Sequence, residues 1–320
     1  YMFSEASAFN QDIGDWDVSS GTNFHAMFLC YGNSLFNQDI GDWDVSNGTS
    51  FDSMFEGATE FNQDVGDWDV SKGTNFGEMF ADATSFNQDI GSWDVSNGTD
   101  FGYMFANWEG SSFNQDIGGW DVSSGTNFYG MFLSHGNSVF NQDIGSWDVS
   151  NGTNFDSMFE GATEFNQDIG DWDISNATDL GEMFAEATSF NQDIGGWDLS
   201  SVLDAGSMFR GATSFKHDIT NWDVSSIKEF EAMFAFTSFN QDISSWDVSS
   251  GTDYGYMFLG ATEFNQDISS WDVSNGESFY GMFSFATDFD QDLRDWDLDS
   301  IPGKPLHIFN GADQMRANGW

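Results

Sequence analysis

The chain is poor in the residues that cross-link small folds or interrupt long ones. Among its 320 residues it has one cysteine, Cys30, so no disulfide can form within it. Its four histidines are scattered along the sequence, at positions 25, 135, 217 and 307, which argues against a zinc site. Only two prolines occur.

Basic residues are also scarce, with seven Lys and Arg against 53 Asp and Glu, and the formal net charge is −46. Phosphate recognition depends on Lys and Arg, so this balance excludes nucleic acid as a partner and disfavours anionic lipid. No apolar run of about 20 residues occurs, so we expect no membrane insertion. No signal peptide is visible, but the chain begins within a repeat, so we expect a segment of a longer protein whose N-terminal end is truncated or continued.

Aromatic residues, by contrast, are abundant at 18% of the chain and indicate a packed core despite the acidity. They follow a repeat marked by the motif Phe-Asn-Gln-Asp-Ile, with a tryptophan seven residues after each phenylalanine. A period of 24 to 27 residues is typical of a solenoid. The motif begins at Phe9, Phe36, Phe61, Phe86, Phe113, Phe140, Phe165, Phe190, Phe215, Phe239, Phe264 and Phe289.

The apolar spacing within one repeat predicts a strand followed by a helix. Ile40-x-x-Trp43-x-Val45 has the spacing of a leucine-rich-repeat strand, with Trp43 and Val45 pointing inward. After a Ser-Asn-Gly-Thr turn, residues 51–58 have apolar side chains at i, i+3, i+4 and i+7, one face of a short helix. We therefore predict an α/β, leucine-rich-repeat-like right-handed solenoid of about twelve 25-residue coils over residues 1–300, with a parallel β-sheet and short helices. Residues 301–320 form a degenerate repeat that we expect to cap the C-terminal end.

The Asn-Gln pair of the motif recurs in nearly every coil. We predict that these side chains form a hydrogen-bonded ladder that satisfies backbone groups of the loops.

Units such as FNQDIGSWDVSNGTNFDSMFEGATEFNQDI, residues 140–169, resemble the 26-residue repeat of the BspA-like leucine-rich-repeat surface protein family of bacteria. The resemblance covers essentially residues 1–300. It implies a secreted or lipid-anchored surface protein that serves adhesion or surface coating, usually without catalytic activity. One departure is the glycine that mostly replaces an apolar residue after Ser-Asn, as at Gly48, which leaves a groove or lets another backbone approach.

Two columns of aspartate, meaning aspartates at the same place in successive coils, run from Asp12 to Asp292 and from Asp17 to Asp297. Stacked carboxylates repel each other. Hydrogen bonds to backbone or Ser/Thr groups of the next coil could relieve this, and so could a structural Ca²⁺; solubility in high salt is a third explanation. Further aspartates two residues earlier in the first three coils make those coils the candidate Ca²⁺ sites. The candidate ligands are Asp15, Asp17, Asp42, Asp44, Asp67 and Asp69.

Four Asn-x-Thr sequons, at Asn47, Asn97, Asn151 and Asn176, are candidate glycosylation sites, or simply turn residues. We do not expect an enzyme, because the paired aspartates recur in every coil whereas an active site is usually a single constellation. A column of threonines makes ice binding a minor alternative.

Features that break the repeat are the candidate interface. Three coils carry two extra residues, and these loops contain Tyr31, Trp108 and His135. Six of the seven basic residues, including Arg210, Lys216 and Lys228, lie in the last third. Both features favour contacts between copies of the chain.

These patterns predict an extracellular structural protein that builds a surface filament or layer as a homo-oligomer or polymer. The alternative is a cell-surface adhesin that binds a glycan or a protein. Outward residues that vary between coils would favour the adhesin. Around the invariant Asp17 column they vary little, which favours the structural role.

Overall fold

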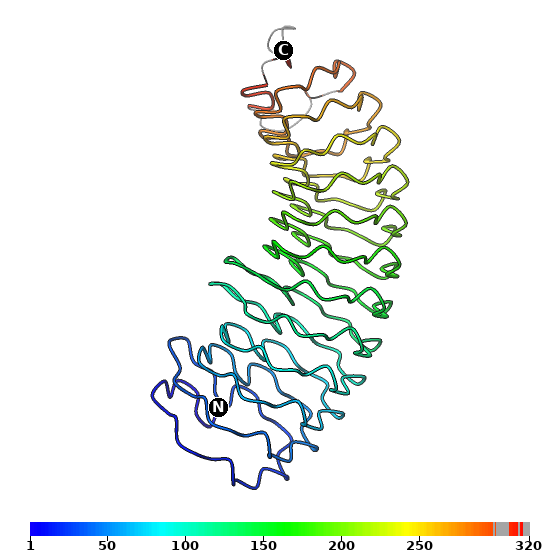
Figure 1. Ribbon diagram of the computed structural model, residues 1–320. Helices are drawn as coiled ribbons and strands as arrows, with labels where there is room; N and C mark the ends of the chain where they lie inside the picture. The colour runs from blue at the N-terminus through cyan, green and yellow to red at the C-terminus, as the bar shows by residue number, and fades with distance from the viewer. Residues whose placement is uncertain (297, 299–306, 313, 316–320) are drawn as a thin grey trace.

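The computed structural model describes residues 1–296, 298, 307–312 and 314–315. The chain winds into coils that are stacked in chain order, and together they form a long, curved and twisted rod (Figure 1). Each coil runs from one Phe-Asn-Gln motif to the next. The predicted solenoid of stacked repeats is therefore present.

The predicted α/β class, with its parallel sheet and short helices, is wrong. Among the described residues, only 314–315 are α-helical, a single 3₁₀ residue lies at 298, and no strand extends beyond one bridging residue. Parallel bridges join one residue per coil to its counterpart in the next coil, and a second series has one bridge, between Asn107 and Ser134. The main series runs through Asn23, Ser50, Asn75, Asp100, Asn127, Asn154, Asp179, Asp204, Glu229, Asp253 and Ser278.

The segment predicted to be helical carries most of the hydrogen bonds between coils. In residues 51–57, alternate N–H groups donate to carbonyls of the next coil, as from Phe51 to Asn75 at 2.9 Å, while Met54 bonds back to Phe51 at 3.0 Å. Ser53 and Gly57 have left-handed backbone angles, with φ of 53° and 67°. Left-handed residues end a right-handed helical turn, so the segment becomes a series of tight turns. We call residues 50–57, and the equivalent stretch of every coil, the ladder segment.

The same apolar spacing therefore suits two backbones. Phe51, Met54, Phe55 and Ala58 are all fully buried, as the helix hypothesis required. In the coils without an insertion, two left-handed residues turn the chain back often enough to keep these side chains on one side without a helix.

The segment predicted as the strand makes no backbone hydrogen bond to neighbouring coils in the described chain; instead Trp43 Nε1 donates to the Ile13 carbonyl of the preceding coil at 3.0 Å. Ring centroids of successive coils are 5.0–5.7 Å apart in the Phe51 column, which follows the bridges. They are 6.3–6.5 Å apart in the Trp column. The rings are thus closer together in the column beside the bridges, and no bridge joins the tryptophan segments of the described chain.

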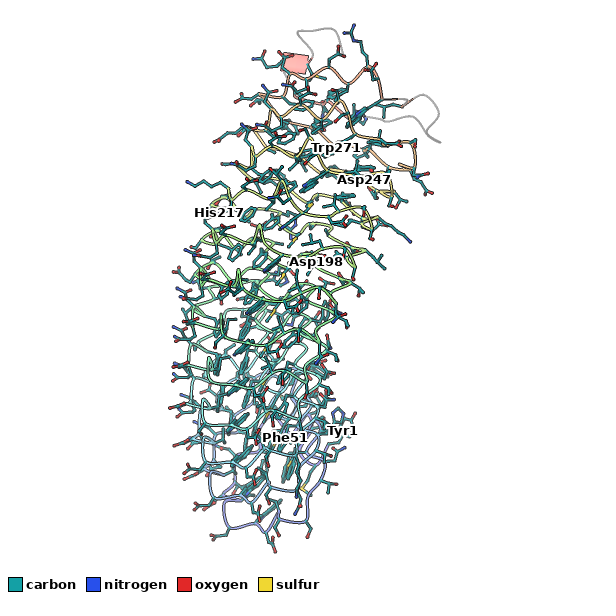
Figure 2. All side chains as sticks on the ribbon, turned by 90° about the vertical axis from the view of Figure 1, so that its right-hand side faces the viewer. Tyr1, Phe51, Asp198, His217, Asp247 and Trp271 are labelled. Atoms are coloured by element: carbon teal, nitrogen blue, oxygen red, sulfur yellow. The ribbon has the colours of Figure 1, made fainter. Side chains whose placement is uncertain are left out.

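The core is a stack of aromatic columns. Every tryptophan of the repeat from Trp43 to Trp296 is at most 6% exposed, which confirms the predicted inward direction. Figure 2 shows Phe51 and Trp271 among the rings inside the rod, with rows of oxygen-tipped side chains outside it. None of the described residues belongs to a helix with the length and hydrophobicity that a membrane span requires.

The Asn-Gln ladder forms as predicted. Asn141 Oδ1 accepts from the backbone N–H of Asn166 at 3.0 Å and from Nε2 of Gln167 at 2.9 Å, and neighbouring coils repeat this arrangement. Each asparagine side chain thus satisfies a backbone donor of the next coil.

Replacing Asn141 with alanine should destabilise the chain by about 1–2 kcal/mol, because it leaves the Asn166 N–H without an acceptor. The natural control is Lys216, which takes the asparagine position in its own coil and has no side-chain oxygen to lose. We expect Lys216→Ala to change the free energy of unfolding, measured by urea denaturation, by less than about 0.5 kcal/mol. Equal losses of unfolding free energy in the two variants would contradict a contribution of the asparagine ladder to stability.

The predicted C-terminal cap falls mainly outside the described residues, as do Asp297, Lys304 and Arg316. Within it, the carbonyl of Ile308 accepts from the Phe283 N–H at 2.8 Å, and Phe309 stacks on Phe283 at 5.6 Å. Residues 307–312 thus continue the stack.

Candidate functional site

The outward side chains of the ladder segments form a continuous face, which we call the ladder face. Its composition changes from coil to coil, unlike the constant aspartate columns. The position two residues after each bridge holds His25, Asp52, Gly77, Gly102, Tyr129, Asp156, Gly181, Gly206, Glu231, Gly255 and Tyr280. The low variation of outward residues noted in the sequence concerns a different segment, because the strand was predicted at residues 40–45. The ladder face is thus the surface whose outward residues vary from coil to coil.

Most of the ladder face is acidic. One hollow lies over Gly181 and Gly206, which contribute no side chains, and has a volume of about 330 Å³. Burial, and then the neighbouring Asp179, raise the pKa of Asp156 to about 6. Burial also raises the pKa of Glu231. The carboxylates around the hollow belong to Asp156, Glu182, Asp204, Glu229 and Glu231.

Arg210 lies on this face and contacts three carboxylates. Its guanidinium nitrogens are 2.8 Å from Glu186, 3.5 Å from Glu182 and 3.7 Å from Glu160. Arg210 reaches Glu160 two coils back over Ala185, whose side chain is small. Glu160 is only 7% exposed, and burial raises its pKa. Arg210 pairs within its own chain, and Lys216 and Lys228 are exposed. The contact with another copy of the chain remains a prediction for these three residues.

The inserted loops also reach the ladder face. Tyr31 is 79% exposed and Trp108 is 50% exposed. His135 stacks on Trp108 with ring centroids 4.9 Å apart. Tyr103 and Tyr129 add an edge-to-face pair at 4.5 Å beside Trp108. The change of period identified the loop residues as candidates from the sequence. It did not identify Tyr103 and Tyr129, because both lie in segments that were predicted to be helical.

The candidate Ca²⁺ ligands lie on exposed turns on either side of the tryptophans. Asp44 Oδ1 accepts from the Ser46 hydroxyl at 2.6 Å and from the Ser46 N–H at 3.1 Å. These hydrogen bonds lower the pKa of Asp44, and equivalent bonds lower those of Asp17 and Asp69. Asp17-type carboxylates are thus held within their own turn rather than by the next coil.

Across the described residues, no group of three or more His, Cys, Asp or Glu side chains is arranged to hold a metal ion. The Ca²⁺ site remains a prediction for its candidate ligands, which are Asp15, Asp17, Asp42, Asp44, Asp67 and Asp69.

The four sequon asparagines are exposed, and each donates from Nδ2 to a serine carbonyl of the preceding coil at 2.8–2.9 Å. An N-linked glycan leaves one hydrogen on Nδ2, so the bond is compatible with modification. Glycosylation remains a prediction for Asn47, Asn97, Asn151 and Asn176.

Comparisons with known proteins identify a family but no function. No curated protein matches the chain. A solved chain from "Crystal structure of TLR13-ssRNA13 complex" is 11% identical, with a TM-score of 0.15, and the match covers 87% of this chain and 42% of that chain. This chain thus spans less than half of that chain's length, and the TM-score is too low to support any argument. Four overlapping segments, residues 1–111, 29–138, 109–222 and 207–320, match the family described as "Mycoplasma protein of unknown function, DUF285". Because these matches extend over the whole sequence, the chain belongs to the DUF285 family of repeat proteins.

Proposed function

We propose that this chain is the repeat region of an extracellular cell-surface protein, and that its ladder face binds a basic segment of a partner protein. The surface location rests on the resemblance of its repeats to those of bacterial surface proteins. The binding role rests on the ladder face, which varies between coils, is mostly acidic and exposes Tyr31 and Trp108. Exposed aromatics among charged groups are typical anchors of protein interfaces.

The observation that carries the proposal is the contact of Arg210 with Glu160, Glu182 and Glu186. Carboxylates from two successive coils lie close enough together for one guanidinium to reach all three. The hollow over Gly181 and Gly206 has a similar set of carboxylates. Among the ion pairs of the described chain, only the one between Glu182 and Arg210 involves a residue of this hollow. A partner's arginine or lysine would supply the missing positive charge.

The filament or layer hypothesis remains a second prediction, with weaker support. Its predicted basic contacts are Arg210, which also pairs with Glu186 of its own chain, and the exposed Lys216 and Lys228. No reaction is proposed for the chain.

The test is binding of a fluorescently labelled arginine decamer, with a glutamate decamer as reference, measured by anisotropy at about 0.15 M salt. The ladder variant removes four charges by Asp156→Asn, Asp204→Asn, Glu229→Gln and Glu231→Gln. We expect the unmodified chain to bind the basic decamer and the ladder variant to bind it at least tenfold more weakly.

The matched control removes four charges from the tryptophan side of the same stretch of the rod, in the four coils that begin at Phe165, Phe190, Phe215 and Phe239, by Asp173→Asn, Asp198→Asn, Asp223→Asn and Asp247→Asn. Asparagine keeps the Oδ1 that accepts from serine at these places. The control should weaken binding less than twofold. Similar losses of decamer affinity in both variants would show that binding depends only on net charge, and would refute specific binding at the ladder face. Binding of neutral glycans without binding of the decamer would favour a glycan-binding adhesin instead.

A further inference from the structure

The two-residue insertions form a cleft at the N-terminal end of the ladder face. The coils that begin at Phe9 and Phe86 carry insertions, whereas the two coils between them do not. The inserted loops therefore stand as two walls, and the shorter coils form a floor. The cleft has a volume of about 230 Å³; Tyr31 lies in one wall and Trp108 in the other.

The floor carries two carboxylates, those of Glu56 and Asp82. Both side chains are half-buried, and Glu109 adds a third acid beside Trp108. Burial raises the pKa of Glu56 to about 7 and also raises that of Asp82. None of the ion pairs in the described chain includes any of these three acids.

The walls carry aromatic side chains. Asp82 Oδ1 accepts the N–H of Trp108 at 2.9 Å, and His135 stacks on Trp108. Opposite, Tyr31 lines the same cleft as Glu56, and the charge of Glu56 is the main cause that raises the pKa of Tyr31. The Tyr31 N–H donates to Glu5 Oε1 at 3.3 Å.

We propose that this cleft binds a single arginine side chain of the basic partner, with the guanidinium stacked on Trp108 and its charge held by Glu56 and Asp82. The inference rests on the proposed function and names one residue of the partner. A guanidinium suits the cleft better than an ammonium because its planar face stacks on indole while its edge donates hydrogen bonds to carboxylates. The same pairing of guanidinium and carboxylates occurs at Arg210 on this face.

The test uses the full chain and three short peptides, acetyl-Gly-X-Gly-amide with X as arginine, lysine or citrulline, titrated by calorimetry at about pH 8. Citrulline has nearly the shape of arginine without its charge. We expect the arginine peptide to bind at least tenfold more tightly than the citrulline peptide and more tightly than the lysine peptide. Tetramethylammonium serves as a further probe, and its binding with equal affinity would contradict the choice of guanidinium.

Trp108→Ala and Glu56→Gln should each weaken arginine-peptide binding at least tenfold. The matched controls are Tyr280→Ala and Glu263→Gln, an exposed aromatic and an exposed acid that lie outside both the cleft and the hollow. They should leave peptide binding within twofold. Melting temperatures of all four variants separate a lost site from a lost fold.

The decamer experiment shows whether a negative result concerns only the arginine cleft or also the proposed binding function. If the ladder variant loses the decamer but Trp108→Ala leaves arginine-peptide binding intact, the cleft assignment is wrong and the proposed function stands. If neither the decamer nor the peptide binds, both are wrong.

Discussion

Replacing Gly161 with alanine is expected to destabilise the protein by about 3 kcal/mol or more. Gly161 has a φ of 66°, and a Cβ there would lie 1.6 Å from the carbonyl oxygen of Ser134 in the preceding coil. The left-handed angle costs an alanine about 1–2 kcal/mol, and overlap with a backbone atom adds about 1–3 kcal/mol. Gly57 is in the same position against Cys30, at 1.8 Å.

The reason lies in the insertions. Cys30 and Ser134 belong to coils with two extra residues, and neither has the left-handed angle that most coils adopt at this place. Between regular coils, the same position accommodates side chains as large as those of Glu186 and Phe236. Glycine is thus required where a regular coil follows an inserted one.

The matched control is Gly211→Ala. Gly211 has a φ of 72°, but its added Cβ would meet only the flexible side chain of Glu186. We expect the control to lose about 1 kcal/mol in urea denaturation followed by circular dichroism. If Gly161→Ala lowered the free energy of unfolding no more than this control, the close contact between Gly161 and the Ser134 carbonyl would be contradicted.

Acidification from pH 8 to about pH 5 is expected to stabilise the folded chain, by about 1–2 kcal/mol in total. Burial raises the pKa of Glu56 from 4.5 to about 7 and that of Asp156 from 3.8 to about 6. Between the unfolded and folded pKa values the folded state binds more protons, so stability falls as the pH rises through this window. The magnitude is reduced because both side chains are partly exposed and screened by solvent.

At lower pH the stability is expected to fall again, because of the carboxylates of the Asp17 column. Serine hydrogen bonds lower the pKa of Asp44, as they do at equivalent positions. The stability they contribute is present above the unfolded pKa of 3.8 and is lost as the pH falls below it. The melting temperature should therefore pass through a maximum near pH 5.

A Glu56→Gln, Asp156→Asn double variant provides the control, because it removes the two most strongly raised carboxyl groups. Its melting temperature should change less between pH 5 and pH 8 than that of the unmodified chain. An unmodified chain that melts at a lower temperature at pH 5 than at pH 8 would show that these carboxyl groups are not buried as described.

Much of the interior followed from the sequence. The spacing of Phe36, Trp43, Phe51 and Phe55 was enough to place their columns in the core, because only inward-facing positions need the same large apolar side chain in every coil. The recurrence of Asn-Gln predicted its ladder for the same reason, since each asparagine satisfies the N–H of its counterpart in the next coil. The inserted loops were likewise visible as changes of period.

The backbone within each coil was decided only by the tertiary structure. Apolar residues at i, i+3, i+4 and i+7 fit a helix, but they fit equally a series of turns with left-handed residues at Ser53 and Gly57. Contacts with the next coil select the turns, because alternate N–H groups then reach its carbonyls. At Trp43 the coil is joined to the preceding one by the indole N–H, which donates to the Ile13 carbonyl, and no bridge of the predicted sheet forms there.

The candidate site depended on the same choice. Sequence alone identified Tyr31 and Trp108 as residues of unusual loops, and Arg210 as one of few basic residues. It did not show that Tyr31 and Trp108 lie on opposite walls of one cleft, or that Arg210 pairs with Glu160 two coils away. Those relations depend on how the coils stack and on which segment of each coil faces outward. A repeat pattern determines the period of the stack. It does not determine which segment of each coil carries the backbone hydrogen bonds to the next.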